Sequence, residues 1–298
     1  MEVYAAKLGR GGQIVVNGFF LLLSACIVAP FVLIVSVSLT TEEKLYELGY
    51  SFFPRGFSTL AYEYLFQSPG VILRAYGNTV FVTLVGTLLG LLLTALIGYV
   101  ISRRDYRFRS PLTVFVFIPM MFSGGLVPFY ILMTQYLHLK DSLWAIVLPG
   151  LLSPFYVLIM KGFMGKIPYE LVESAKMDGA GEWRIFFRLV VPLSTPALAT
   201  LGLFMAFNYW NEWFNALLFI NDDTKVPLQL LLVRIMNTLD FLRNNSEYIQ
   251  SLGINMSQFP NESVRMALVV LVAGPMMFVF PFFQKYFVQG LTVGSLKG

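Results

Sequence analysis

The chain of 298 residues is 57% hydrophobic and only 13% charged, with a mean hydropathy of +0.70 and a net charge of +4. Soluble domains carry about 25% charged residues, so this composition excludes an ordinary water-soluble globule. Basic residues lie in short stretches beside apolar spans, as orienting loop charges do, so the net charge is not a sign of nucleic-acid binding. We expect one all-α integral membrane domain over residues 1–298.

The chain contains a succession of apolar stretches. Each is close to the length of about 20 residues that a bilayer-spanning helix needs. Four arginines in the run SRRDYRFRS follow the second stretch, which assigns that end to the cytoplasm. With six spans, both termini then lie in the cytoplasm. The expected spans are residues 14–37, 76–101, 111–134, 143–164, 194–220 and 264–283.

The third span contains residues that interrupt a helix: Pro119, Gly124, Gly125 and Pro128. Non-helical backbone at membrane depth is tolerated only where it is buried in protein or lines a water-filled cavity. The break around Ser123 is therefore either part of a solute pathway or a packing kink.

The fifth span contains amides, an acid and two tryptophans within FNYWNEWFNALLF. An ionisable residue in a span costs about 2.5–3.5 kcal/mol on insertion scales, so such residues are functional candidates. Asn208, Asn211, Glu212 and Asn215 recur at the spacing of one helix face. Aromatic rings and amides together suit a sugar, which offers a flat apolar face and hydroxyls. The alternative is an interfacial aromatic belt, which does not explain the amides. The candidate pathway residues are Asn208, Trp210, Asn211, Glu212, Trp213 and Asn215, with Ser123, Gly124 and Gly125 opposite.

Residues 166–192 form the longest stretch that is both charged and helix-patterned, so they belong in water. Pro168 suits a first helical position, and Gly179 and Gly181 provide a sharp turn near Asp178. A second short helix follows, with an apolar stripe that is too short to be stable alone and needs a partner surface. Its members are Trp183, Phe186, Phe187 and Val190.

The sequence has no phosphate-binding GxxxxGK[ST], no HExxH and no GxSxG, and its single histidine and cysteine provide no metal ligand set. We therefore expect a protein that is not an enzyme and does not itself hydrolyse ATP. Energy for uphill transport would come from a partner or from an ion gradient.

Three groups of residues within 166–192 resemble the EAA loop of ATP-binding-cassette (ABC) importer permeases. They are Glu173-Ser174-Ala175, Asp178-Gly179-Ala180, and Leu189, Val191 and Pro192. Ser174 stands where the pattern has Ala, a small-for-small change.

The resemblance extends over nearly the whole chain. Asn78, the Tyr99…Ser102-Arg103 ending of the second span, Pro128 and the tail QKYFVQGLTVGSLKG are similar to sugar-importer permeases of the maltose-transporter type. The run SGGLVPFYIL is similar to the branch for complex or polymeric saccharides, including uronate oligosaccharides.

The resemblance implies the type I ABC importer permease architecture with a cytoplasmic coupling helix, in the bacterial cytoplasmic (inner) membrane. The implied partners are a homologous second permease, an ATPase dimer that binds ATP and Mg²⁺, and an extracellular or periplasmic solute-binding protein. This chain then needs no cofactor. The implied ATPase-coupling residues are Glu173, Ser174, Ala175, Asp178, Gly179, Ala180, Trp183, Phe186, Phe187 and Pro192.

Two alternatives stay open. An ABC permease for amino acids, polyamines or phosphonates would also carry the EAA loop. An ion-coupled secondary transporter would explain the intramembrane acid, but it would need no docking hairpin.

Overall fold

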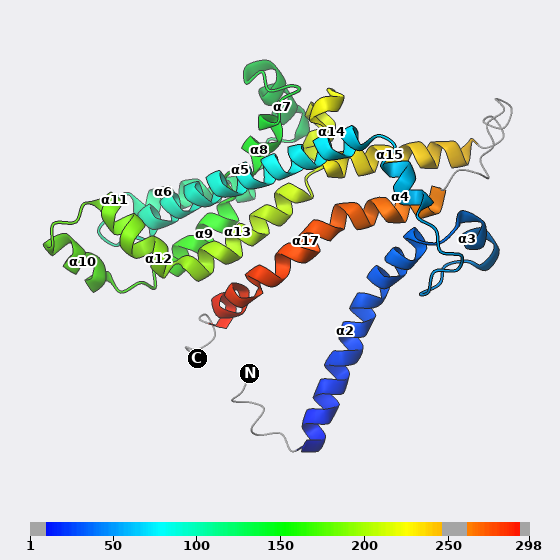
Figure 1. Ribbon diagram of the computed structural model, residues 1–298. Coiled ribbons are helices and arrows are strands. Elements are labelled where there is room, and N and C mark those ends of the chain that lie inside the picture. The colour runs from blue at the N-terminus through cyan, green and yellow to red at the C-terminus, as the bar shows by residue number, and fades with distance from the viewer. Residues whose placement is uncertain (1–9, 246–260, 293–298) are drawn as a thin grey trace. The chain divides into compact units, whose positions relative to one another are not determined.

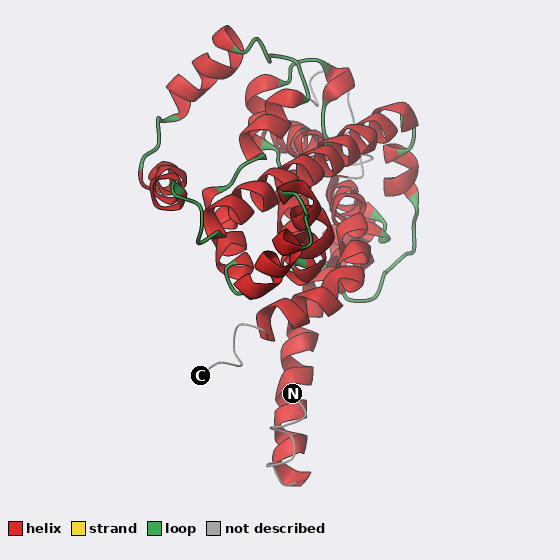
Figure 2. Cartoon of the chain, turned by 90° about the vertical axis from the view of Figure 1, so that its left-hand side faces the viewer, coloured by secondary structure: helices red, strands yellow, loops and turns green. Residues whose placement is uncertain are grey.

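The computed structural model describes residues 10–245 and 261–292, and every regular element in these ranges is a helix (Figure 1; Figure 2). Thr40 and Phe57 form an isolated antiparallel bridge. The chain divides into two compact units, Met1–Pro69 with Ile235–Ala273 (unit 1) and Gly70–Arg234 with Gly274–Gly298 (unit 2). The all-helical fold agrees with the sequence analysis.

Unit 1 contains the first apolar helix, α2 (Arg10–Ser38), followed by the short helices α3 (Glu42–Leu48) and α4 (Leu60–Leu65). The first part of α17 (Asn261–Thr292) also belongs to this unit. The Glu42 carboxylate accepts hydrogen bonds from the backbone N–H groups of Glu262 and Ser263, at 2.9 and 3.2 Å. These N–H groups have no partner within α17, so Glu42 caps its first turn.

Unit 2 contains the long helix α5 (Pro69–Ser102), whose buried side chains pack with those of Ile146, Met160 and Leu201. Figure 1 shows α10 to α12 at one end of α5, and α7, α8 and α14 near the other. The other elements are α6 (Arg109–Met121), α7 (Leu126–Ile131), η1 (Leu132–Tyr136), α8 (Trp144–Gly150), α9 (Pro154–Met164), α10 (Tyr169–Met177), α11 (Glu182–Ile185), η2 (Phe186–Val190), α12 (Val191–Leu193), α13 (Thr195–Trp210), α14 (Phe214–Phe219), η3 (Asp223–Lys225) and the first part of α15 (Leu228–Asn244), whose residues from Ile235 on belong to unit 1.

Three helices in the described ranges are long and apolar enough to span a membrane, and up to six spans result if each bent pair of helices counts as one. The bent pairs are Arg109–Met121 with Leu126–Tyr136 (111°), Trp144–Gly150 with Pro154–Met164 (47°), and Glu182–Leu193 with Thr195–Trp210 (80°). The first break lies at Ser123-Gly124-Gly125, which the sequence marks as an interruption, and the second lies directly before Pro154, the first residue of α9.

The expectation of one continuous helix over residues 194–220 is wrong. Helix α13 ends at Trp210, residues 211–213 are not helical, and α14 begins at Phe214. Consequently, the spacing of Asn208, Asn211, Glu212 and Asn215 does not produce a single polar stripe. The amide and carboxylate groups instead compete with the backbone for hydrogen bonds, which favours a helix end over a helix interior.

Glycines of α5 allow neighbouring elements to approach its backbone closely. A Cβ atom at Gly86 would lie 2.4 Å from the Tyr209 ring, one at Gly90 would lie 2.9 Å from the Leu151 carbonyl oxygen, and one at Gly98 would lie 2.8 Å from the Met160 side chain. The spacing of Gly86 and Gly90 indicates such an approach, and the structure shows what occupies each position.

Candidate functional site

The segment of residues 166–192 forms a helical hairpin at one end of α5. Helix α10 follows Pro168 and ends at Met177, as the sequence predicts. Gly179 has φ +73°, a left-handed conformation that glycine adopts without steric cost. The N–H groups of Gly179 and Ala180 bond the carbonyls of Lys176 and Ala175, both at 2.9 Å, and so satisfy the end of α10.

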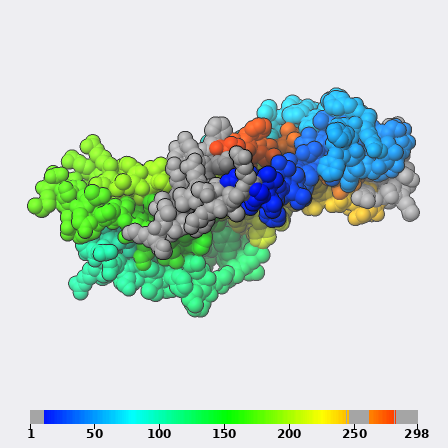
Figure 3. Space-filling model, turned by 90° about the horizontal axis from the view of Figure 1, so that it is seen from below, coloured from blue at the N-terminus to red at the C-terminus, as the bar shows by residue number. Residues whose placement is uncertain are grey.

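The outer surface of this hairpin combines exposed polar residues with exposed apolar ones. Glu173, Ser174 and Asp178 are exposed. Met177 is 88% exposed, Trp183 66% and Phe187 53%. The Trp183 and Phe187 rings are stacked, with centroids 6.0 Å apart. The space-filling view shows this segment at the surface of the molecule, in yellow-green (Figure 3).

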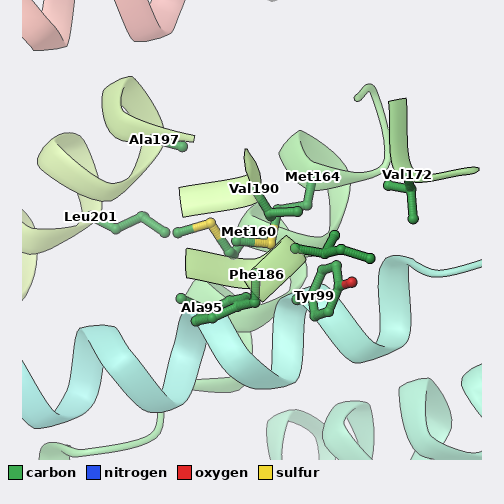
Figure 4. Packing of buried hydrophobic residues seen from close by; sticks show 10 residues of the cluster. Ala95, Tyr99, Met160, Met164, Val172, Phe186, Val190, Ala197 and Leu201 are labelled. Atoms are coloured by element: carbon green, nitrogen blue, oxygen red, sulfur yellow. The ribbon is translucent and has the colours of Figure 1, made fainter. Parts of the chain in front are cut away.

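The apolar stripe is predicted to need a partner surface, and this is wrong for two of its four members. The stripe consists of Trp183, Phe186, Phe187 and Val190. Phe186 is 1% exposed and Val190 2%. Both belong to a cluster of this chain with Ala95 and other side chains of α5, α9 and α13 (Figure 4). The helix beyond Ile185 is a π-turn, which changes the residue spacing and divides the stripe between the core and the surface.

The remaining coupling candidates lie around this cluster. Ala175 and Ala180 are partly buried and pack against it, whereas Pro192 is exposed in α12. The small side chains at positions 175 and 180 therefore let the hairpin fold closely onto the unit.

Charged groups connect the hairpin to the end of α5. Arg103 binds Asp105 through two nitrogens, at 2.8 and 2.5 Å, and pairs with Glu182 at 3.1 Å. Lys176 lies 3.1 Å from both Asp105 and Glu182. Hydrogen bonds from Arg103, and then Lys176, hold the pKa of the Asp105 carboxyl well below its usual range, although partial burial opposes this shift. Bonds to Asp105 and Glu182 raise the pKa of Lys176. The network is therefore fully ionised at neutral pH.

A cavity of about 420 Å³ lies in unit 2 between the α8–α9 break and the α13–α14 break. Three predicted pathway residues line it: Asn208, Glu212 and Asn215. The Asn208 amide donates to the Tyr156 hydroxyl at 2.8 Å, and Glu212 Oε1 accepts the N–H of Asn215, in the first turn of α14, at 2.9 Å. Polar groups and the rings of Phe155 and Tyr156 thus face one space.

The other predicted residues of the fifth span do not line this cavity. Asn211 donates to the Phe207 carbonyl and accepts from Gln229, at 2.8 and 2.9 Å. Trp210 is buried at 6% exposure, with its ring 6.4 Å from that of Tyr76. Trp213 is 41% exposed.

Ser123, Gly124 and Gly125 line a different cavity, of about 540 Å³, at the sharp break between α6 and α7. Gly125 has φ +81° and precedes α7. The two cavities have no lining residue in common, so this chain alone does not bring the third-span break and the fifth-span residues together.

Sequence reasoning missed two tyrosines at the first cavity. Tyr156 holds Asn208, and Tyr209 lies between Gly86 and Gly150 with its hydroxyl bonded to the Val147 carbonyl at 2.9 Å. The signal for Tyr156 was its position just after the Ser153-Pro154 break. Tyr209 lies in an aromatic run where nothing singles it out.

Comparison with known proteins gives consistent matches over most of the chain. Residues 86–293 match the family described as the binding-protein-dependent transport system inner membrane component. The chain is 37% identical to Protein LplC of Bacillus subtilis (strain 168), over 100% of this chain and 99% of that protein. It is 38% identical to the polygalacturonan/rhamnogalacturonan transport system permease protein YtcP of the same organism, over 96% of this chain and 98% of YtcP.

A solved structure agrees with these sequence matches. The crystal structure of a bacterial ABC transporter involved in the import of the acidic polysaccharide alginate contains a chain that superposes with a TM-score of 0.80. The two chains are 27% identical, and the match covers 94% of this chain and 99% of that one. The family match includes the hairpin and both cavities described above. The chain therefore belongs to the inner membrane components of binding-protein-dependent transport systems and is a multi-pass permease of the ABC importer class.

Proposed function

We propose that this chain is a permease subunit of an ATP-driven importer for oligosaccharides or polysaccharide, including uronate-containing chains. The observation that carries the proposal is the near-full-length match to YtcP, whose name specifies polygalacturonan and rhamnogalacturonan. The arabinooligosaccharide permease AraQ of Bacillus subtilis (strain 168), 30% identical over 96% of this chain, supports a saccharide. The similarity to the alginate importer structure supports an acidic saccharide.

The hairpin supplies the surface on which an ATPase subunit docks. An apolar centre with a charged rim suits specific association between proteins. Met177, Trp183 and Phe187 form the exposed apolar part, and Glu173 and Asp178 lie beside them. ATP and Mg²⁺ bind in that ATPase, and this chain performs no chemical step. The match to binding-protein-dependent permeases leaves the ion-coupled alternative without support.

The solute pathway passes the cavity of Asn208, Glu212 and Asn215 and continues on a second, homologous permease. Glu212 is the only charged residue among the described residues that line this cavity. In a site of low dielectric constant, the Glu212 carboxylate would repel the carboxylate of an acidic sugar. The positive charge that balances a uronate therefore comes from the partner permease.

The orientation follows from the arginines after α5. Arg103, Arg104, Arg107 and Arg109 follow the end of α5 at which Figure 1 shows α10 and α11, and this cluster of positive charge supports a cytoplasmic position for that end and for the hairpin. Both termini are cytoplasmic in this arrangement, and the solute-binding protein docks on the opposite side.

The test combines co-purification with ligand binding. We expect an affinity-tagged copy of this chain, expressed with its neighbouring genes, to bring down an ATPase and a second permease. The solute-binding protein of the same system should bind oligogalacturonides or neutral oligosaccharides in calorimetry, and not amino acids or polyamines. Tight binding of an amino acid would leave the permease assignment intact and would overturn the proposal that the solute is a saccharide.

A further inference from the structure

Arg103 occupies an unusual place for a charged side chain. It is 8% exposed, and among the buried residues in the described ranges it is the only one with a formal charge. A charge is kept out of water only where other groups compensate for the lost hydration. The position directly after the last turn of α5 favours a cation, because the C-terminal end of a helix is its negative end. Asp105, just beyond the end of α5, binds the guanidinium group through two nitrogens, and side chains from three helical elements provide further contacts.

The guanidinium group contacts α5 and both helices of the hairpin. It lies 5.4 Å from the ring centroid of Tyr99 in α5 and 6.0 Å from that of Tyr169, the first residue of α10. Its ion pair with Glu182 reaches the first residue of α11. One buried side chain therefore joins the end of α5 to each half of the hairpin.

Further contacts attach α11 to the same turn of α5. The Tyr99 hydroxyl donates to Glu182 Oε2 at 2.8 Å. Four residues further on, the Phe186 ring packs 5.4 Å from the Tyr99 ring (Figure 4). By contrast, the turn between α10 and α11 contains Gly179 and Gly181, and a Cβ atom at either would meet nothing within 4 Å. The orientation of the hairpin therefore depends on side-chain contacts of its two helices, which are those at Arg103, the Lys176–Asp105 ion pair and the apolar packing of Phe186.

We infer that Arg103 and Glu182 are positioning residues for energy coupling. They hold the hairpin in a fixed orientation on the end of α5, so that a displacement of α10 and α11 moves α5 and is not absorbed by the glycine turn. The inference rests on the proposed function, because it requires an ATPase docked on the hairpin. It adds a role for two residues that do not touch solute or nucleotide.

The first test measures ATP hydrolysed per saccharide transported, in proteoliposomes that contain the whole complex with its binding protein. In Glu182→Gln, an exposed side chain loses its charge, so the fold is retained and the ATPase co-purifies in the normal amount. We expect the ATP-to-saccharide ratio to rise several-fold. Glu170→Gln is the matched control: it removes an exposed acid of the same hairpin, in the first turn of α10, and should leave the ratio unchanged.

A charge exchange separates positioning from a structural defect. Arg103→Glu alone should uncouple the complex, and Arg103→Glu combined with Glu182→Arg should recover part of the lost coupling. A wild-type ratio in Glu182→Gln would overturn the inference.

The second test needs no ATPase. Spin labels are placed at the exposed positions Arg104 and Arg184 in a Cys26→Ser background, which removes the only cysteine. We expect a narrow distance distribution that broadens in Glu182→Gln, and equal widths would contradict the inference. If the unmutated complex shows no ATP-dependent uptake while the distances behave as expected, the proposed function fails and the positioning contact stands.

Discussion

At the scale of single residues, Tyr209 shows how the broken spans are held together. Its ring fills the space left by two glycines, Gly86 of α5 and Gly150 of α8, and its hydroxyl satisfies the Val147 carbonyl beside the α8–α9 break. A freed carbonyl in a span needs such a partner, because no water is available in the bilayer core. The tyrosine therefore supports the wall of the cavity that contains Asn208.

We predict that Gly86→Ala destabilises the protein. The added Cβ would lie 2.4 Å from the Tyr209 ring, and overpacking of this kind costs about 1–3 kcal/mol. Gly77→Ala in the same helix is the matched control, since nothing lies within 4 Å of that Cβ position. Thermal unfolding of the detergent-solubilised protein should show a lower midpoint for Gly86→Ala only. Equal midpoints would show that α5 and Tyr209 can move apart freely.

Glu212 has two roles that one substitution can separate. Its carboxylate accepts the Asn215 N–H in the first turn of α14, and it carries the charge in the cavity. Glu212→Gln keeps an acceptor oxygen and loses the charge, so we expect normal assembly and an altered rate of saccharide uptake. Glu212→Ala also loses this hydrogen bond, which costs about 1 kcal/mol. An unchanged uptake rate in Glu212→Gln would favour the aromatic-belt interpretation.

At the scale of elements, the hairpin depends on the left-handed backbone at Gly179. An alanine there costs about 1–2 kcal/mol, because its Cβ crowds the following carbonyl. Gly181 has φ −72° and ψ 161°, which alanine adopts freely. We predict that Gly179→Ala reduces stimulation of the ATPase by the loaded binding protein, and that Gly181→Ala does not. Similar stimulation in both variants would show that the geometry of this turn is not needed for coupling.

The sequence predicts these elements where local signals are strong. Pro168 and Gly179 mark the limits of α10, and Gly124 and Gly125 mark the break before α7. The end of α13 at Trp210 was missed because periodicity continues through a break: Asn208 and Asn215 have helical spacing although residues 211–213 between them are not helical. Burial of Phe186 was missed for another reason, since spacing cannot tell a face that covers its own chain from one that awaits a partner.

At the scale of the whole molecule, contacts between distant residues decide what the individual motifs can do. Glu182 and Arg103 are far apart in the sequence, and no local pattern pairs them. The family match over residues 86–293 and the saccharide names of relatives agree with the resemblance that the sequence shows at the EAA loop and beyond it. We propose a permease in which the hairpin of residues 166–192 receives work and the cavity of Asn208 contacts solute.

ATP-dependent uptake of a labelled oligosaccharide tests this account most directly. The measurement uses proteoliposomes that contain this chain, its partner permease and the ATPase, with the binding protein outside. We predict that uptake requires both ATP and the binding protein. We also predict that uptake is lost in Gly179→Asp, although the complex stays inserted and still hydrolyses ATP. Uptake that persists without ATP, or that follows an imposed ion gradient, would contradict the account.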